Sequence, residues 1–179
     1  MPITTGQVAE AGDFPSSSSG AGDSGKVNKL NGDGRNPVDF NAFEGVRVYQ
    51  NAGTSIQPGF TVLPFQVESF DTNTFHDNAT NNTRLTVPTG KGGKYIIGAN
   101  ISDDGGTDVA AYIILNGTTI IAMNSAEAFF TPAPNLAVSV ISLYELAAGD
   151  YVEVFANTNG GSNTSGDAQT AFWMYRLAP

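Results

Sequence analysis

The pattern of hydrophobic and polar positions after Gly45 is that of a β protein. Short runs rich in Val, Ile, Tyr and Phe alternate with turn-forming clusters at spacings of about 8–12 residues. We expect strands at nine of these runs: residues 46–50, 60–66, 84–88, 94–101, 109–116, 118–124, 136–146, 150–157 and 171–177. No window shows a convincing helical period, so a parallel sheet with helical crossovers is not expected.

Turn residues connect several of these runs directly. Asn116 and Gly117 lie between two apolar runs, which is the strongest short signal for a two-residue hairpin turn. Gly149 and Asp150 predict another tight connection before the next run. Short strands joined by tight turns favour an antiparallel sandwich or barrel.

Several expected strands are apolar on both faces, although a sandwich strand should be apolar only on its inner face. The last run, "AFWMYRL", is apolar or aromatic on both faces except at Arg176, and the runs around Tyr95 and Phe155 also break the alternation. Contiguous apolar surface of this size usually marks an interface. We therefore expect a homo-oligomer formed across one sheet. The residues expected at its axis are Tyr95, Phe155, Trp173 and Tyr175.

Residues 1–44 differ from the rest in composition. "PSSSSGAGDSGKVNKLNGDGRNP" is mostly Ser, Gly, Asp and Asn, which cannot bury enough apolar surface to order the segment alone. A disordered tail and a segment that orders against a partner are equally good interpretations. In the second, six spaced apolar residues would be the anchors: Val8, Phe14, Val27, Leu30, Phe40 and Phe43. The chain thus divides into an extended N-terminal arm (1–44) and a β domain (45–179).

Charge and composition restrict the partners. The chain has 17 acidic and 8 basic residues, a net charge of −9, and its basic residues are scattered singly. Neither nucleic acid nor an anionic membrane surface is an expected partner. Cysteine is absent, which excludes disulfides and thiolate sites. We expect neither a signal peptide nor a transmembrane helix, because no sufficiently long apolar run occurs.

His76 is the only histidine, and it lies between Asp71 and Asp77 in "FDTNTFHDNATNN". No nucleophile-elbow pattern accompanies it, and a metal site would need more imidazoles or thiolates than this chain has. We interpret the stretch as a loop held by Asp and Asn side chains that bond to the backbone, so no catalytic residue is assigned. Paired carboxylates of a glycosidase are the remaining catalytic alternative.

A second acidic loop, "SDDGGTD", places Asp103, Asp104 and Asp108 around two glycines. Carboxylate oxygens on a flexible loop suit Ca²⁺, but the spacing of an EF-hand is not present. We favour a solvated hairpin loop that needs no cofactor or metal, with Ca²⁺ binding as the alternative.

Four stretches carry a resemblance to a known family: "RLTVPTGKGGKYIIGANI", "AYIILNGTTIIA", "SLYELAAGDYVEVFA" and the aromatic last strand. Together they resemble the jelly-roll module of complement first-component heads and tumour necrosis factor ligands. The likeness extends to structural proteins of tailed bacteriophages, where "GVRVY", "FD", "HD", "RLT" and "LNG" recur in this order. The resemblance implies a trimer of ten-stranded antiparallel jelly rolls with a binding or structural role and no catalysis.

The resemblance and the arm together predict a trimeric virion structural protein, either a capsid decoration protein or a head fibre. The arm would bind the major capsid protein or another virion protein, at the capsid surface, after assembly in the host cytoplasm. The alternative is the receptor-binding tip of a tail or neck fibre, and a polysaccharide depolymerase is a third, weaker candidate. In a fibre tip, apical loops would contact host surface glycans through Asp71, His76, Asp77, Asp103, Asp104 and Asp108.

Overall fold

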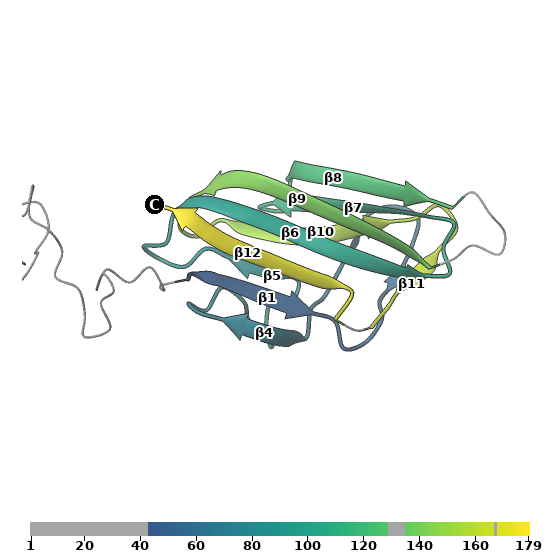
Figure 1. Ribbon diagram of the computed structural model, residues 1–179, viewed down its shortest axis with the longest axis horizontal. Coiled ribbons are helices and arrows are strands. Elements are labelled where there is room, and N and C mark those ends of the chain that lie inside the picture. Colours follow the sequence, from purple (N-terminus) through teal and green to yellow (C-terminus); the bar gives the residue numbers. More distant parts are fainter. Residues whose placement is uncertain (1–42, 129–134, 167) are drawn as a thin grey trace, which may run out of the picture. The chain divides into compact units, whose positions relative to one another are not determined.

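The computed structural model describes residues 43–128, 135–166 and 168–179. These residues form two antiparallel sheets, as Figure 1 shows. The strands are β1 (Gly45–Tyr49), β2 (Ser55–Ile56), β3 (Thr61–Val62), β4 (Val67–Asp71), β5 (Arg84–Thr86), β6 (Gly93–Asp104), β7 (Asp108–Leu115), β8 (Thr119–Glu127), β9 (Leu136–Leu146), β10 (Tyr151–Asn157), β11 (Ser162–Thr164) and β12 (Ala171–Ala178). The expected all-β antiparallel sandwich is confirmed.

The larger sheet, which we call sheet A, is built around β6. This strand pairs with β9 on one side and with β12 and the short β11 on the other. The sheet continues from β12 to β1 and β4, while β2 pairs with β11. At twelve residues β6 is long enough to hold both β12 and β11, one after the other.

The smaller sheet, sheet B, has β10 and β7 at its centre. β8 pairs with β7 at one edge, and β3 and β5 pair with different parts of β10. Asn116 and Gly117 form the hairpin turn between β7 and β8, with positive φ values of 50° and 70° that Asn and Gly tolerate. The tight turn before β10 contains Gly149 at φ 91°. Both predicted turns are confirmed.

All nine strands expected from the hydrophobic pattern are present, and three further strands were not expected. β2, β4 and β11 have the sequences SI, VESFD and SNT, which lack an apolar period long enough to recognise. The run expected at residues 60–66 contributes only the two residues of β3. Pro64 interrupts this run, because proline has no N–H to donate to a ladder.

The core lies between the two sheets and is formed by the inward side chains of both. Its largest fully buried members are aromatic and long aliphatic residues, among them Phe65, Phe75, Tyr95, Phe172 and Met174. Burial of this apolar surface is the main favourable term that holds the sheets together. No described part of the chain forms a helix that could cross a membrane.

The compact unit begins at Phe43, two residues before the expected boundary. The Phe43 ring lies against Phe70 and Tyr175, with centroid distances of 5.6 and 5.0 Å. Of the six expected anchors, only Phe43 is described, and it belongs to the folded unit. The other five, and the rest of the arm, lie outside the described residues. The arm's role and the trimer stay predictions.

The two ends of the sandwich are distinct. Gly45 lies opposite Tyr175, and Ala178 lies opposite Lys94. The start of β1, the end of β12 and the start of β6 therefore lie at the same end of the sandwich. We call this the proximal end. The opposite end, where β6 finishes at Asp104, is the distal end (Figure 1).

Candidate functional site

Two neighbouring rows of side chains on the outer face of sheet A are apolar. Pairing across β12, β6 and β9 aligns these rows, which are Tyr175–Ile96–Leu143 and Trp173–Gly98–Ile141. We call these six residues the apolar face. Leu143 is 70% exposed and Ile141 is 58% exposed. The apolar face is therefore an uncovered hydrophobic surface on a single protomer.

Strand alternation explains why these residues point outward. Their neighbours in sequence, such as Ile97, Val140 and Met174, fill the core, and successive side chains of a strand point to opposite faces. The next row toward the distal end contains Asn100 and Ser139, whose side chains are hydrogen-bonded to each other at 2.7 Å. The apolar face therefore ends at a polar row.

Trp173 lies across β6 at Gly98. A Cβ atom built on Gly98 would stand 2.5 Å from the Trp173 ring, closer than two carbon atoms can approach. The indole therefore rests directly on the backbone of β6, and only glycine leaves room for it. This contact keeps Trp173 half-buried on the apolar face.

Aromatic rings extend the apolar face at the proximal end. Tyr175 and Phe70 are stacked, with centroids 6.1 Å apart and an interplanar angle of 17°. Phe43 covers both rings and remains 55% exposed. The first described residue of the domain is thus part of the same hydrophobic surface.

The four residues expected at an oligomer axis do not share one surface. Trp173 and Tyr175 do lie on the apolar face. Tyr95 is 0% exposed, and its hydroxyl donates to the Lys91 carbonyl inside the protomer, so it offers no surface to a second copy. Phe155 lies on sheet B, where its ring packs against Phe60. Tyr95 is therefore a core residue, and Phe155 lies on the other sheet, so neither belongs to the apolar face.

Sequence reasoning missed Ile96, Ile141 and Leu143 as surface residues. The signal was present, because "LAVSVISLYEL" carries Ile141 and Leu143 at alternate positions whose counterparts in an ordinary sandwich strand are polar. Without the register, the sequence does not show that these two residues align with Trp173 and Tyr175.

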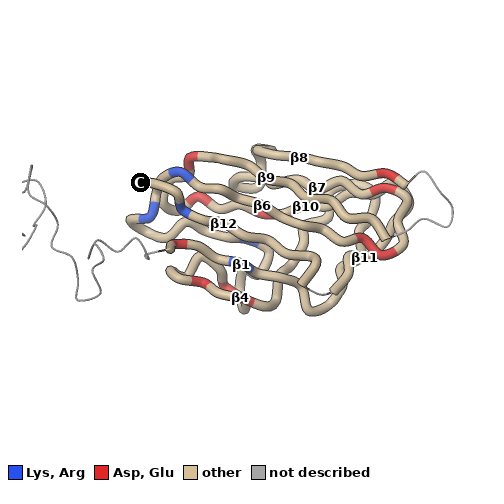
Figure 2. Tube along the Cα trace, viewed as in Figure 1, with Lys and Arg blue, Asp and Glu red and all other residues tan. Residues whose placement is uncertain are grey.

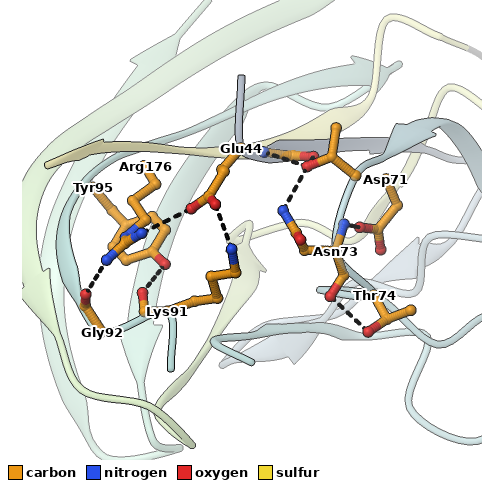
Figure 3. Close-up of polar contacts among 10 residues, drawn as sticks. Glu44, Asp71, Asn73, Thr74, Lys91, Gly92, Tyr95 and Arg176 are labelled. Atoms are coloured by element: carbon orange, nitrogen blue, oxygen red, sulfur yellow. Dashed lines mark hydrogen bonds and ion pairs between the residues drawn. The ribbon is translucent and has the colours of Figure 1, made fainter. Parts of the chain in front are cut away.

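An ionic cluster fixes the start of the domain at the proximal end (Figure 3). The Glu44 carboxylate accepts from Lys91 Nζ, and it accepts from Arg176 Nη1 at 2.9 Å. Arg176 Nη2 also donates to the Gly92 carbonyl at 2.8 Å. The bonds from Lys91 and then Arg176 hold the pKa of Glu44 below its ordinary value. Glu44 thus ties the chain to both β12 and the loop before β6.

Hydrogen bonds from side chain to backbone hold the loop after β4. Asp71 accepts from the backbone N–H of Asn73 at 3.1 Å and of His76 at 2.9 Å. Asp77 accepts from the N–H groups of Ala79 and Thr80, and these bonds lower its pKa. The expected bonds from Asp side chains to the loop backbone are confirmed, whereas the Asn73 and Asn78 side chains donate to other side chains instead.

His76 is 8% exposed and is held on both sides of its ring. Nδ1 lies 3.1 Å from a Glu68 carboxylate oxygen, and Nε2 lies 3.4 Å from the Asn82 carbonyl oxygen. Both ring nitrogens therefore have partners within the loop and β4. This arrangement suits a side chain that organises the loop.

The acidic residues of the distal loop differ from one another. Asp103 is 0% exposed; Oδ2 accepts from Gly106 N at 2.8 Å, while Oδ1 has no hydrogen-bond partner among the described residues. Burial raises the pKa of the Asp103 carboxyl above its ordinary value. Asp104 is exposed, and Asp108 accepts from Asn159 N at 3.1 and 3.2 Å. No three His, Cys, Asp or Glu side chains gather to hold a metal ion in the described parts of the chain.

The two loops expected to form one apical surface lie at opposite ends. Asp71 pairs with Val46 near the start of β1, which places it with His76 and Asp77 toward the proximal end. Asp103 and Asp104 end β6 at the distal end. Figure 2 shows that end carrying acidic and no basic residues among those described. The two loops therefore do not lie together at one apex of the domain.

Compared by sequence, the chain matches no protein-family model and no curated protein. Compared by structure, it is similar to the Eiger tumour necrosis factor of S. frugiperda, at 13% identity and a TM-score of 0.55, over 76% of this chain and 93% of that chain. It is also similar to murine APRIL at pH 5.0 and pH 8.5, at identities of 13% and 11% and TM-scores of 0.57 and 0.56. Each APRIL match covers 75% of this chain and 99% of that chain. The fold is therefore a jelly roll of the tumour necrosis factor type.

Proposed function

We propose that this chain is a non-enzymatic, trimeric structural protein of a tailed-phage virion, and that copies associate through the apolar face. The observation that carries the proposal is the pair of exposed apolar rows across β12, β6 and β9. A folded protein rarely leaves a contiguous hydrophobic patch of this kind uncovered unless another molecule binds there.

A second copy of the chain is the occupant that suits this surface. The one arginine beside the rows, Arg47, already donates to Ser69 Oγ at 2.7 Å and to the Ala168 carbonyl at 3.1 Å, so it needs no charged partner. An apolar partner surface suits these rows, and each copy supplies one in Leu143, Ile141 and Trp173. Closed symmetric self-association is the usual solution, and the family resemblance implies three copies.

The virion role rests on the order of motifs shared with tailed-phage structural proteins and on the arm. The arm joins the domain at the proximal end, beside Glu44 and its ion pairs. Force on the arm would pass through Glu44 to Arg176 on β12 and so into sheet A.

Substitution of one exposed residue on the apolar face tests the proposal. Leu143→Asp places a charge on the most exposed residue of the apolar face. Burying an unpaired charge in an interface costs several kcal/mol, so sedimentation velocity should show monomers. Phe60→Asp is the matched control, because Phe60 is 57% exposed on the other sheet. It should leave the oligomer intact. An unchanged oligomer in Leu143→Asp would refute the apolar face as the interface.

The place of the protein in the particle is tested by its copy number per purified virion, measured by quantitative mass spectrometry against the major capsid protein. A ratio near that of the capsid protein is expected for shell decoration. A few copies in multiples of three would favour the fibre tip instead. Removal of residues 1–42, which keeps Phe43 and Glu44 in the domain, should abolish attachment to heads. Attachment that survives this truncation would contradict the arm's proposed role.

A further inference from the structure

A groove of about 480 Å³ lies on the outer face of sheet B, toward the distal end. Its shape follows from the alternation along β7, whose outward residues are Asp108, Ala110 and Tyr112. A charged, a small and a large side chain in succession leave a hollow over the small one. The groove is thus built into the sequence of a central strand of sheet B.

One wall of the groove is formed by Tyr112 and Met123, and two further aromatic rings lie beside Tyr112 without lining the groove. Tyr112 lies opposite Met123 on β8 and Phe155 on β10. Phe60 packs edge-on against both rings, with centroid distances of 4.8 Å to Tyr112 and 6.1 Å to Phe155. Met123 and Phe60 remain 58% and 57% exposed. This wall offers flat, accessible apolar surface that the core does not use.

The floor of the groove carries polar, uncharged side chains, and its far rim carries acidic ones. Ala110 lies opposite Ser125 on β8 and Asn157 on β10, and Asp108 lies opposite Glu127. Asn157 Oδ1 accepts from Gly59 N at 3.1 Å, which leaves its amide nitrogen as a donor for a ligand. Carboxylate and carboxamide groups therefore line the same hollow as Tyr112.

We propose that this groove binds a neutral carbohydrate. A pyranose ring has an apolar face of C–H groups that can lie on the Tyr112 ring, and hydroxyl groups that can donate to carboxylates and accept from amides. No Lys or Arg side chain is among the described residues that line the groove. Phosphorylated, sulfated or sialylated ligands would therefore meet only like charge, whereas a neutral sugar would not.

The volume of the groove is in the ordinary range for small-ligand sites, which is about 300–1,000 Å³. The site lies on sheet B and the apolar face lies on sheet A, so carbohydrate binding goes beyond the proposed function and does not depend on it. Each copy in an oligomer would carry its own groove. Glycan binding on this surface would give weak sites whose effect is multiplied by the number of copies.

The test uses the full chain and neutral oligosaccharides of glucose, galactose, mannose and N-acetylglucosamine, immobilised on an array and then titrated by calorimetry. Ala110→Gln fills the groove, and Asp108→Asn removes a charge from its rim while it keeps an oxygen for Asn159 N. Each should weaken binding about tenfold or more. Ala137→Gln on exposed β9 and Asp104→Asn on the distal loop are the matched controls and should bind like the wild type.

Binding that resists high salt, together with loss in Ala110→Gln, would establish the site. Three results would overturn it: no binding of any of these oligosaccharides, equal binding by Ala110→Gln, or binding that high salt abolishes, which would show that contacts between charges hold the ligand. Thermal unfolding confirms that each variant is folded. Ala110 and Asp108 lie on sheet B, away from the apolar face. An unchanged sedimentation profile of these two variants would show that a negative binding result leaves the association proposal standing.

Discussion

At the residue scale, Glu44 fixes the segment just before β1 to the rest of the sandwich. Its carboxylate joins Lys91 and Arg176, which are distant in sequence, and its own carbonyl accepts from Arg176 N at 2.9 Å. Glu44→Gln should lower the free energy of unfolding by about 1 kcal/mol at neutral pH, in the range of partly exposed ion pairs. Thermal unfolding of both proteins measures the difference.

The pH dependence of that difference has a definite sign. The folded protein lowers the pKa of Glu44 below 4.5, so the ionised carboxylate stabilises the fold above that pH. The stabilisation is lost as the pH falls through the lower folded-state pKa. Glu145→Gln, on the exposed part of β9, is the control and should change little at any pH. A constant gap between Glu44→Gln and wild type down to strongly acidic pH would contradict this assignment.

Asp103 has the opposite effect on stability. Its carboxyl is buried with one oxygen unpartnered among the described residues, and burial raises its pKa above 3.8. Ionisation therefore destabilises the folded state, and this loss develops as the pH rises from 3.8 through the folded-state pKa. The stability of Asp103→Asn relative to wild type should rise with pH over that interval and then level off. A relative stability that falls with pH would show that the carboxylate is favourably paired.

At the element scale, the contact of β12 with β6 depends on Gly98. Gly98→Ala would force the Trp173 ring off the strand, and overpacking of this kind costs about 1–3 kcal/mol. Gly160→Ala is the control, since a Cβ there meets nothing within 4 Å. Denaturant unfolding should show a clear loss in the first variant and little in the second.

A second substitution tests whether the loss of stability in Gly98→Ala comes from the clash with the Trp173 ring. Trp173→Leu removes the ring that the new methyl group would strike. The double variant with Gly98→Ala should therefore be less destabilised than the sum of the two single variants. Strict additivity would mean that the indole does not lie on Gly98.

The sequence predicted the strands well wherever the apolar alternation ran for several residues. It missed β2, β4 and β11, whose pairing depends on partners far along the chain instead of on their own composition. It also assigned Tyr95 to the surface. When both faces of a strand are apolar, periodicity shows that two faces exist but not which of them is the core.

The candidate sites were less predictable than the strands. Trp173 and Tyr175 stood out as apolar residues in the last strand, and the loop bonds of Asp71 and Asp77 followed from local spacing. The ionic cluster of Glu44 and the groove over Ala110 depend on register between distant segments. No local pattern in the sequence encodes that register.

At the scale of the whole molecule, the two candidate surfaces lie on opposite sheets, and the acidic loops lie at opposite ends. This arrangement allows association, attachment and ligand binding to use different parts of one small domain. It also makes the only tryptophan of the chain, Trp173, a direct reporter of the apolar face.

The fluorescence of Trp173 should therefore report association. If a neighbouring copy covers the ring in the wild type, as proposed, acrylamide should quench it weakly. In Leu143→Asp the ring should be quenched more strongly, and its emission should shift to longer wavelength. Phe60→Asp serves again as the control and should resemble the wild type. Equal quenching in all three proteins would show that Trp173 is not covered by another copy.

The most direct test of the central claim is the absolute mass of the wild-type chain in solution, measured by light scattering over a range of concentrations. One chain has a mass of 18.6 kDa. We predict three times that value, maintained on dilution. A mass of one chain at every concentration would contradict association through the apolar face, and a mass of two chains would contradict the trimer.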